Sequence, residues 1–361
     1  MNKRLGYVDL AKGIAILLVI LGHTLPPANY IRGAIFSFHM PLFFLLGGYT
    51  MKNSETMAEW RERAGRSFRR LVIPAVSLFV IRYLLFILTA PLQGYSWPTL
   101  ADLAFWRDQA ALMLKGILFS SSVAMETRIG FVPAFGMAWF LIVLFTAKTL
   151  LDLLHLKIRG WRLGFVSLLL LLAGVRIGAY LRLPFSFDLS MAVVIYLWMG
   201  KNLPHQFIEE RPFVRFLEFG SLWASLLLFQ YFRFHEYADL SQRRYSQFPL
   251  CYMVAICGSL MVMYFSRMID REGFPFRQIR YIGQYSMDIL CIHIMDVVWF
   301  PFLAESIRVL PLLCITRIAI DLAIFVLYRR FVRGGCRKAA VAEKKYKAGD
   351  DKQGKKQKSI Y

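Results

Sequence analysis

The sequence predicts an all-α integral membrane protein, a polytopic helical bundle with about ten transmembrane helices. Hydrophobic residues make up 57% of its 361 residues, whereas soluble globular domains are usually about 45–50% apolar. The apolar runs, such as 71–90 and 163–181, are continuous over about 20 residues, which is the length of a membrane-spanning helix. They do not alternate with the period of two that marks a membrane β-barrel.

Ten apolar runs divide the chain, at residues 10–25, 33–51, 71–90, 131–151, 163–181, 187–200, 214–232, 248–266, 284–303 and 310–328. The first run carries Lys12 and is not followed by a pattern of small residues for cleavage, so we expect a retained helix rather than a signal peptide. The run 187–200 is short. The long connection 91–130 mixes aromatic and charged residues, and we expect it to hold an amphipathic or re-entrant helix on the outer face.

The distribution of basic residues predicts the orientation in the membrane. Six Lys and Arg residues lie in 52–70 and four in 267–280, whereas three of the alternate connections carry one each, at Arg32, Arg182 and Arg308. By the positive-inside rule, both termini are therefore expected in the cytoplasm.

The formal net charge of +21 is high enough to suggest nucleic acid as a partner. Much of this charge lies in the short loops and at the C-terminus, so we expect no nucleic-acid binding. We predict a transmembrane domain over 1–331 and a basic, disordered cytoplasmic tail over 332–361 that rests on anionic membrane lipids. The five cysteines show no Cys-x-x-Cys spacing, so no metal site is predicted.

The first apolar run, RLGYVDLAKGIAILLVILGHT, contains three polar residues that need an explanation: Asp9, Lys12 and His23. On one helix Lys12 and His23 share a face, about 16 Å apart along the axis, and Asp9 can pair with Lys12. Ionisable groups inside a membrane are costly and usually functional. His23 is therefore a candidate general base. The alternatives are a histidine satisfied by a neighbouring carbonyl and a lysine that anchors the helix at the interface.

Two further segments carry candidate binding residues. In the second run His39 precedes Pro41, and Gly47-Gly48 follow, a combination that suits a cavity wall or simple packing. The basic segment after this run repeats arginine every three residues and predicts a phosphate-binding row at the cytoplasmic mouth, with ordinary positive-inside anchoring as the alternative. The row consists of Arg63, Arg66 and Arg69, with Arg70 beside them.

Later in the chain, Trp139 opens an apolar run, and the segment GQYSMDILCIHI contains Ser286, Asp288 and His293. Ser286 and His293 are seven residues apart and share a helix face, whereas Asp288 and His293 do not. A serine-histidine pair is possible here, although serine is also common packing material in membrane helices.

Five segments resemble the acyltransferase 3 family in identity and order: YVDLAKGIAILLVILGHT, FHMPLFFLLGGY, RRLVIP, WFLIVLF and GQYSMDILCIH. The resemblance is closest to the sugar O-acetyltransferase branch typified by fucose 4-O-acetylases. The family pattern places an arginine, ten residues and then a histidine in the first helix. His23 matches this histidine. Lys12 occupies the position of the family's arginine, so the positive charge is kept but the forked donor geometry of a guanidinium group is lost. His293 matches a late family histidine, and Gly47 stands where the family often has serine.

The resemblance implies a multi-pass enzyme of the bacterial inner membrane. Such an enzyme transfers an acyl group, usually acetyl from acetyl-CoA, to a hydroxyl of a carbohydrate or lipid-linked glycan. No cofactor is bound, because acetyl-CoA is the donor substrate. In this interpretation His23 is the base, Lys12 and Asp9 set the field around the donor, and Arg66, Arg69 and Arg70 bind the acyl-CoA phosphates. The supporting pocket is expected to consist of His39, Trp139, Ser286 and His293.

Two other classes of function stay open from the sequence. A proton-coupled transporter or a flippase of a lipid-linked sugar can use His23, His39 and His293 as a proton relay. A haem or metal membrane protein is a weaker alternative, because no clustered ligand spacing is present.

Overall fold

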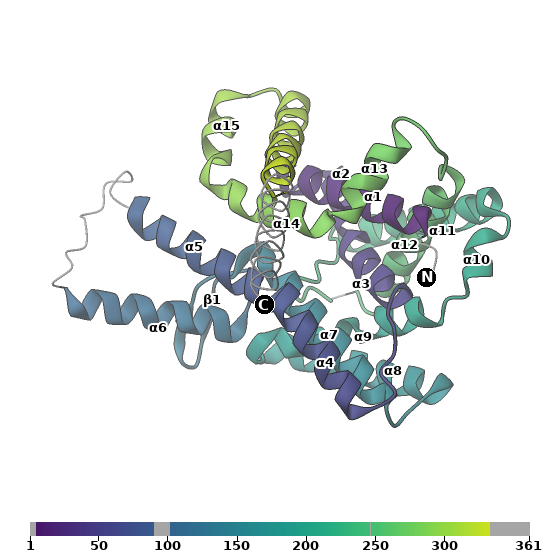
Figure 1. Cartoon of the computed structure of the whole chain (residues 1–361), viewed down its shortest axis with the longest axis horizontal. Helices are drawn as coiled ribbons and strands as arrows, with labels where there is room; N and C mark the ends of the chain where they lie inside the picture. Colours follow the sequence, from purple (N-terminus) through teal and green to yellow (C-terminus); the bar gives the residue numbers. More distant parts are fainter. Residues whose placement is uncertain (1–4, 90–101, 246, 333–361) are drawn as a thin grey trace, which may run out of the picture.

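The computed structural model describes residues 5–89, 102–245 and 247–332, and these residues form a bundle of helices with one small hairpin (Figure 1). The helices are α1 (Gly6–Thr24), α2 (Tyr30–Phe36), α3 (His39–Tyr49), α4 (Met57–Ser67), α5 (Ile73–Thr89), α6 (Leu103–Phe119), α7 (Trp139–His155), α8 (Gly160–Tyr180), α9 (Phe187–Asn202), α10 (His205–Glu209), α11 (Pro212–Phe234), α12 (Leu250–Met268), α13 (Phe276–Gln284), α14 (Ser286–Met295), α15 (Phe300–Ser306) and a final helix Leu310–Val332. The hairpin pairs β1 (Met125–Thr127) antiparallel with β2 (Gly130–Val132).

The fold class is confirmed as all-α, and the described residues contain eight helical segments long and apolar enough to cross a bilayer. A ninth is possible if α14 and α15, which are bent by 66° at a short break, form one span. The prediction of ten spans is not confirmed. The run 187–200 forms α9, whose 16 residues extend only about 24 Å, less than the roughly 30 Å of a hydrocarbon core.

Helix α1 packs closely against α13 because two glycines let the backbones meet. A Cβ at Gly283 would overlap the carbonyl oxygen of Asp9, and a Cβ at Gly13 would overlap that of Ile279. Asp9 is buried at this contact, while Lys12 is half-buried. The first predicted span therefore forms one continuous helix, and its N-terminal half is fixed by backbone-to-backbone packing.

Replacement of Gly283 by alanine is expected to destabilise the protein by about 1–3 kcal/mol, because the added methyl group forces α1 and α13 apart. Gly65 on α4 provides the matched control, since no atom lies within 4 Å of the Cβ that alanine would add. Gly65→Ala should leave stability unchanged or raise it slightly through helix propensity. Thermal unfolding of the purified protein measures both variants, and equal melting temperatures would contradict the close approach.

Helix α9 lies inside the bundle and packs against α3, again through glycines that let the two backbones approach closely. A Cβ at Gly48 would overlap the carbonyl oxygen of Leu197, and one at Gly200 would overlap that of Leu45. On its other side α9 contacts α8, where Gly174 meets the backbone of Asp188. This burial explains why a helix too short to be a regular span is nevertheless apolar.

The long connection between the third and fourth predicted spans does contain a helix, α6, which projects beside α5 (Figure 1). Gly116 of α6 packs on the ring of Phe79, and the Tyr83 hydroxyl donates to Gln109 over 2.9 Å. The residues 91–101 of this connection lie outside the described part of the chain. So does the predicted basic tail 332–361, except for Val332.

Candidate functional site

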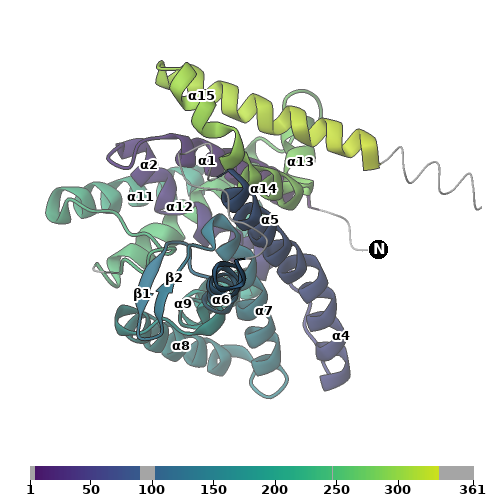
Figure 2. The same cartoon turned by 90° about the vertical axis from the view of Figure 1, so that its left-hand side faces the viewer.

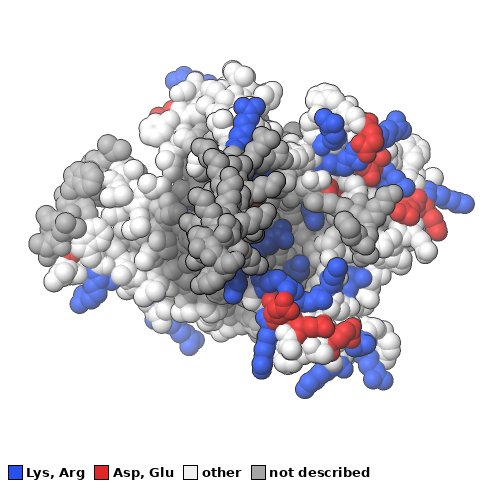
Figure 3. Space-filling view, in the orientation of Figure 1, with Lys and Arg blue, Asp and Glu red and all other residues white. Residues whose placement is uncertain are grey.

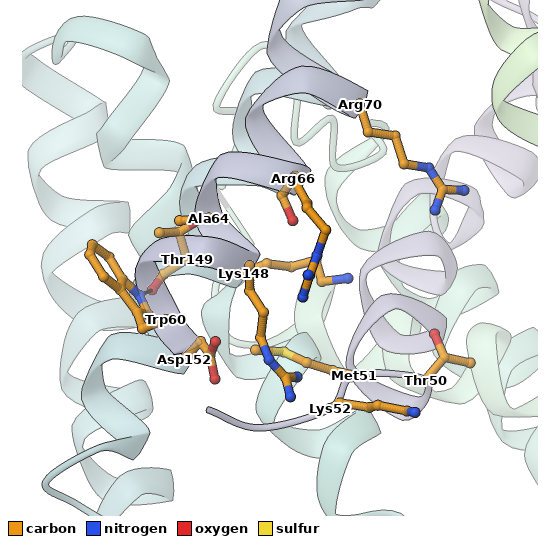
Figure 4. A pocket seen from close by; sticks show the side chains of 12 residues that line it. Thr50, Met51, Lys52, Trp60, Ala64, Arg66, Arg70, Lys148, Thr149 and Asp152 are labelled. Atoms are coloured by element: carbon orange, nitrogen blue, oxygen red, sulfur yellow. Dashed lines mark hydrogen bonds between the residues drawn. The ribbon is translucent and has the colours of Figure 1, made fainter. Parts of the chain in front are cut away.

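A basic pocket of about 370 Å³ opens where α4 meets α7 and the segment after α3 (Figure 4). Its cationic lining residues are Lys52, Arg63, Arg66, Arg70 and Lys148. In Figure 4, Arg66 and Arg70 reach from the helix toward the segment that carries Met51 and Lys52. Figure 3, in the orientation of Figure 1, shows Lys and Arg side chains gathered in the centre and lower part of the molecule. We name this hollow the basic pocket.

The arginines that line the basic pocket come from two helical segments. Arg63 and Arg66 lie about one turn apart on α4, and Arg70 lies in the π-helical turn Phe68–Val72 that joins α4 to α5. Arg69 belongs to the same π-helical turn but is not among the lining residues. The predicted trio Arg66, Arg69 and Arg70 is thus brought together only in part. Arg66 also pairs with Glu62 one turn before it.

Two contacts fix the walls of the basic pocket. The Asp152 carboxylate on α7 accepts hydrogen bonds from the backbone N–H and the hydroxyl of Ser54, at 2.9 and 2.7 Å. The Trp60 indole on α4 donates to the carbonyl of Thr149 on α7 over 3.0 Å. These bonds hold α4 and the segment that carries Lys52 against α7.

Lys12 contributes to the electrostatics of this end of the molecule. Lys148 of the basic pocket lies close enough to Lys12 and Arg70 to interact with their charges. The cation of the first helix therefore lies near the cations of the basic pocket. Lys148 and Asp152 were missed, although charged residues four apart in an apolar run were a usable signal.

A second, small pocket of about 40 Å³ lies at the other end of α1 and contains His23. We name it the histidine pocket. Its walls include His39, Trp139 and the loop residues Asp239 and Ser241. The His23 imidazole lines this pocket and makes no hydrogen bond to any residue that the structure describes.

The neighbouring histidines differ from His23 in their bonding. The Nδ1 of His39 lies 2.9 Å from the carbonyl oxygen of Ile35, so this buried side chain is satisfied within its own span. The ring of His293 lies 5.7 Å from that of His23, centroid to centroid. Its Nδ1 lies 2.8 Å from an oxygen of Asp296 and 3.0 Å from an oxygen of Asp321. The hydrogen bonds of His293 thus go to carboxylates, and the possible pair with Ser286 is not formed.

Arg317 of the final helix joins this cluster to α1. Its guanidinium donates to both oxygens of Asp296, at 2.7 and 2.9 Å. It also donates to the carbonyl oxygen of His23 over 3.0 Å, and lies 3.3 Å from the hydroxyl of Thr24. Carbonyls at a helix C-terminus lack partners within the helix. Arg317 therefore caps α1 and fixes the backbone that carries His23.

Sequence reasoning missed Asp296, Arg317 and Asp321, all of which are buried. The signal was present, because Arg317 and Asp321 are four residues apart in an apolar run and Asp296 follows His293 by three. Ligand atoms of His293, Asp296 and Asp321 all lie within 4.8 Å of one another, a spacing that suits a metal ion. Arg317 already occupies both oxygens of Asp296, so the arrangement is better explained as an ion-pair cluster.

The basic pocket and the histidine pocket lie at opposite ends of α7: Lys148, Thr149 and Asp152 line the first, and Trp139 and Phe140 line the second. Helix α1 contributes His23 to the histidine pocket, and its Lys12 lies near Lys148 of the basic pocket. On α1, Lys12 and His23 are about 16 Å apart along the axis; on α7, Trp139 and Lys148 are about 14 Å apart. The two pockets share no lining residue, and buried apolar side chains such as Val143 pack in the region between them.

This arrangement defines a multi-pass helical membrane protein with a cationic site at one end of α7 and a histidine site at the other. Comparison with protein families gives the assignment: residues 5–327 match the family model described as an acyltransferase domain. The chain belongs to the acyltransferase 3 family, as the motifs of the sequence predicted. No curated protein and no solved structure matches the chain.

Proposed function

We propose that the protein transfers an acetyl group from acetyl-CoA to a hydroxyl of a cell-surface sugar or polysaccharide, with His23 as the general base. The observation that supports this most is the arrangement of a five-cation pocket and a histidine without a hydrogen-bond partner among the described residues at the two ends of α7, in a chain of the acyltransferase 3 family. The fucose 4-O-acetylase-like motifs favour a sugar as the acceptor.

The basic pocket suits the nucleotide end of acetyl-CoA. That end carries a 3′-phosphate and a diphosphate, and guanidinium groups donate forked hydrogen bonds to phosphate oxygens. A volume of about 370 Å³ is in the range of small-molecule sites. The pantetheine arm would then extend along α1 past Lys12 toward His23. Because the two pockets are separate, side chains along this path must move when the donor enters.

At the histidine pocket, His23 accepts the proton of the acceptor hydroxyl as the oxygen attacks the thioester carbonyl. The carbon–sulfur bond breaks, and the CoA thiolate takes up a proton as it leaves. Holding the two substrates together provides much of the rate increase. A volume of about 40 Å³ holds little more than a water molecule, so the pocket widens when the substrates bind.

The proposal is tested with the purified protein in lipid nanodiscs, supplied with acetyl-CoA and a crude extract of surface glycans. Release of the CoA thiol together with acetylated glycan, detected by mass spectrometry, is expected. Uptake of glycan into proteoliposomes without thiol release would overturn the enzyme and favour a carrier.

Paired replacement of Arg66 and Arg70 by alanine removes two charge-assisted contacts and is expected to raise KM for acetyl-CoA by about 10²–10⁴-fold with little change in kcat. Each charge-assisted bond to a phosphate is worth about 1.5–3 kcal/mol, and tenfold corresponds to 1.4 kcal/mol. Arg69→Ala is the matched control, since Arg69 lies on the same segment but does not line the basic pocket. An equal rise in KM for Arg69→Ala would argue for general surface charge rather than this pocket.

A further inference from the structure

A third hollow, of about 650 Å³, runs between α2 and α11, which lie next to each other at the left of Figure 2. We name it the lateral groove. Three tyrosines line it: Tyr30 on α2, Tyr231 on α11 and Tyr237 in the following loop. The Tyr231 hydroxyl donates to that of Tyr30 over 2.7 Å, and the two rings meet edge to face. The groove is therefore bridged by aromatic rings that carry hydroxyl groups.

One end of the lateral groove is polar and adjoins the histidine pocket. His235, Glu236 and Arg244 line this end, so it offers both donors and acceptors. The ring of Phe36 lies 6.3 Å from that of Tyr237 and 5.3 Å from that of His23. One layer of aromatic rings thus separates the groove from the proposed base.

The other end of the lateral groove is apolar and faces the surroundings of the bundle. Leu227, Leu228 and Phe232 of α11 line it. Helix α11 has the composition of a membrane span, and none of its most apolar stretch is buried within the protein. In a bilayer this end is open to lipid chains. From Leu227 to His235 the groove changes from apolar to polar over about 12 Å.

We infer that the lateral groove binds an amphiphile, a sugar headgroup carried on a lipid chain, and delivers its hydroxyl to His23. The chain lies along α11, and the headgroup packs against the tyrosine rings and reaches the polar end. Aromatic side chains with hydroxyl groups suit a ligand that has apolar C–H faces and polar edges. The identity of this ligand as the acceptor rests on the proposed function. The groove thus selects a lipid-linked acceptor over a free polysaccharide.

An alkyl maltoside with a photoreactive diazirine in its chain serves as the probe, because it is a sugar on an apolar chain. The full-length protein in phosphatidylglycerol and phosphatidylethanolamine nanodiscs is irradiated with the probe, and the labelled peptides are mapped by mass spectrometry. Labelling is expected in 227–237. It should fall by about tenfold in Leu228→Trp, since the larger ring fills the groove.

Leu222→Trp is the matched control, because Leu222 is also an exposed leucine of α11 but does not line the lateral groove. This variant should be labelled like the unmodified protein. In the acyl-transfer assay with a membrane glycolipid fraction, Leu228→Trp should lower kcat/KM for the acceptor by about tenfold and leave KM for acetyl-CoA unchanged.

Three outcomes would overturn the inference: labelling spread evenly along α11, equal labelling of the two tryptophan variants, or equal labelling of 227–237 by a phosphatidylcholine that carries the same diazirine. The last outcome identifies an ordinary lipid site. Failure of the proposed function is distinguishable, because labelling requires no turnover. Sugar-selective labelling without thiol release from acetyl-CoA would leave the groove as an amphiphile site and remove its role in acyl transfer.

Discussion

Replacement of His23 by glutamine is expected to lower kcat for acyl transfer by roughly 10²–10⁴-fold, the usual contribution of a general base. Glutamine keeps much of the size and polarity of the side chain but cannot accept a proton at neutral pH. Binding of acetyl-CoA should be unchanged, since the basic pocket shares no residue with the histidine pocket. Thiol release and the dissociation constant of acetyl-CoA, measured on the same preparation, check both statements.

His39→Gln is the matched control for this variant. His39 lines the same pocket, but its imidazole is buried and bonded to the Ile35 carbonyl, so we expect a much smaller loss of kcat. Partial recovery of His23→Ala by added imidazole would indicate a chemical role that a packing residue does not have. Undiminished acetylation by His23→Gln would remove this residue from the chemistry.

Replacement of Arg317 by methionine is expected to destabilise the protein by about 3–5 kcal/mol, the cost of leaving a buried charge without its partner. The carboxylate of Asp296 would lose both guanidinium hydrogen bonds, and the C-terminus of α1 would lose its cap. Thermal unfolding in nanodiscs measures the loss. The effect should be accompanied by reduced acyl transfer, because the His23 backbone is no longer held.

Two comparisons separate this effect from a general loss of charge. Arg308→Met removes an exposed arginine and should change stability by no more than about 0.5 kcal/mol. The double replacement Arg317→Met with Asp296→Leu removes both members of the pair and should recover much of the lost stability. A single Arg317→Met variant as stable as the unmodified protein would show that the pair contributes little.

Much of the architecture was predictable because membrane spans have a strong compositional signal. All ten apolar runs contain helix, and the first one carries Lys12 and His23 as a single helix, as predicted. The number of spans was not predictable in this way. Hydropathy identifies α9 as apolar, but not that neighbouring helices, rather than lipid, surround it.

The candidate site was predictable only where one helix determines the geometry. Arg66 and Arg70 line one pocket, whereas Arg69 does not, and a residue count could not show this because the chain changes from α-helix to π-helix at Phe68–Val72. The contacts of His293 with Asp321 and of Arg317 with Asp296 join different helices. No spacing within a single helix determines which residues of another helix will face it. These partners could therefore be identified only from the three-dimensional structure.

The attachment of α1 at both of its ends has a consequence for how substrates enter. Backbone contact with α13 holds the N-terminal half, and the guanidinium of Arg317 holds the last turn. A helix held at both ends in this way cannot slide along its axis or rotate about it. Admission of two large molecules must therefore depend on displacement of the helices around α1 rather than on movement of α1 itself.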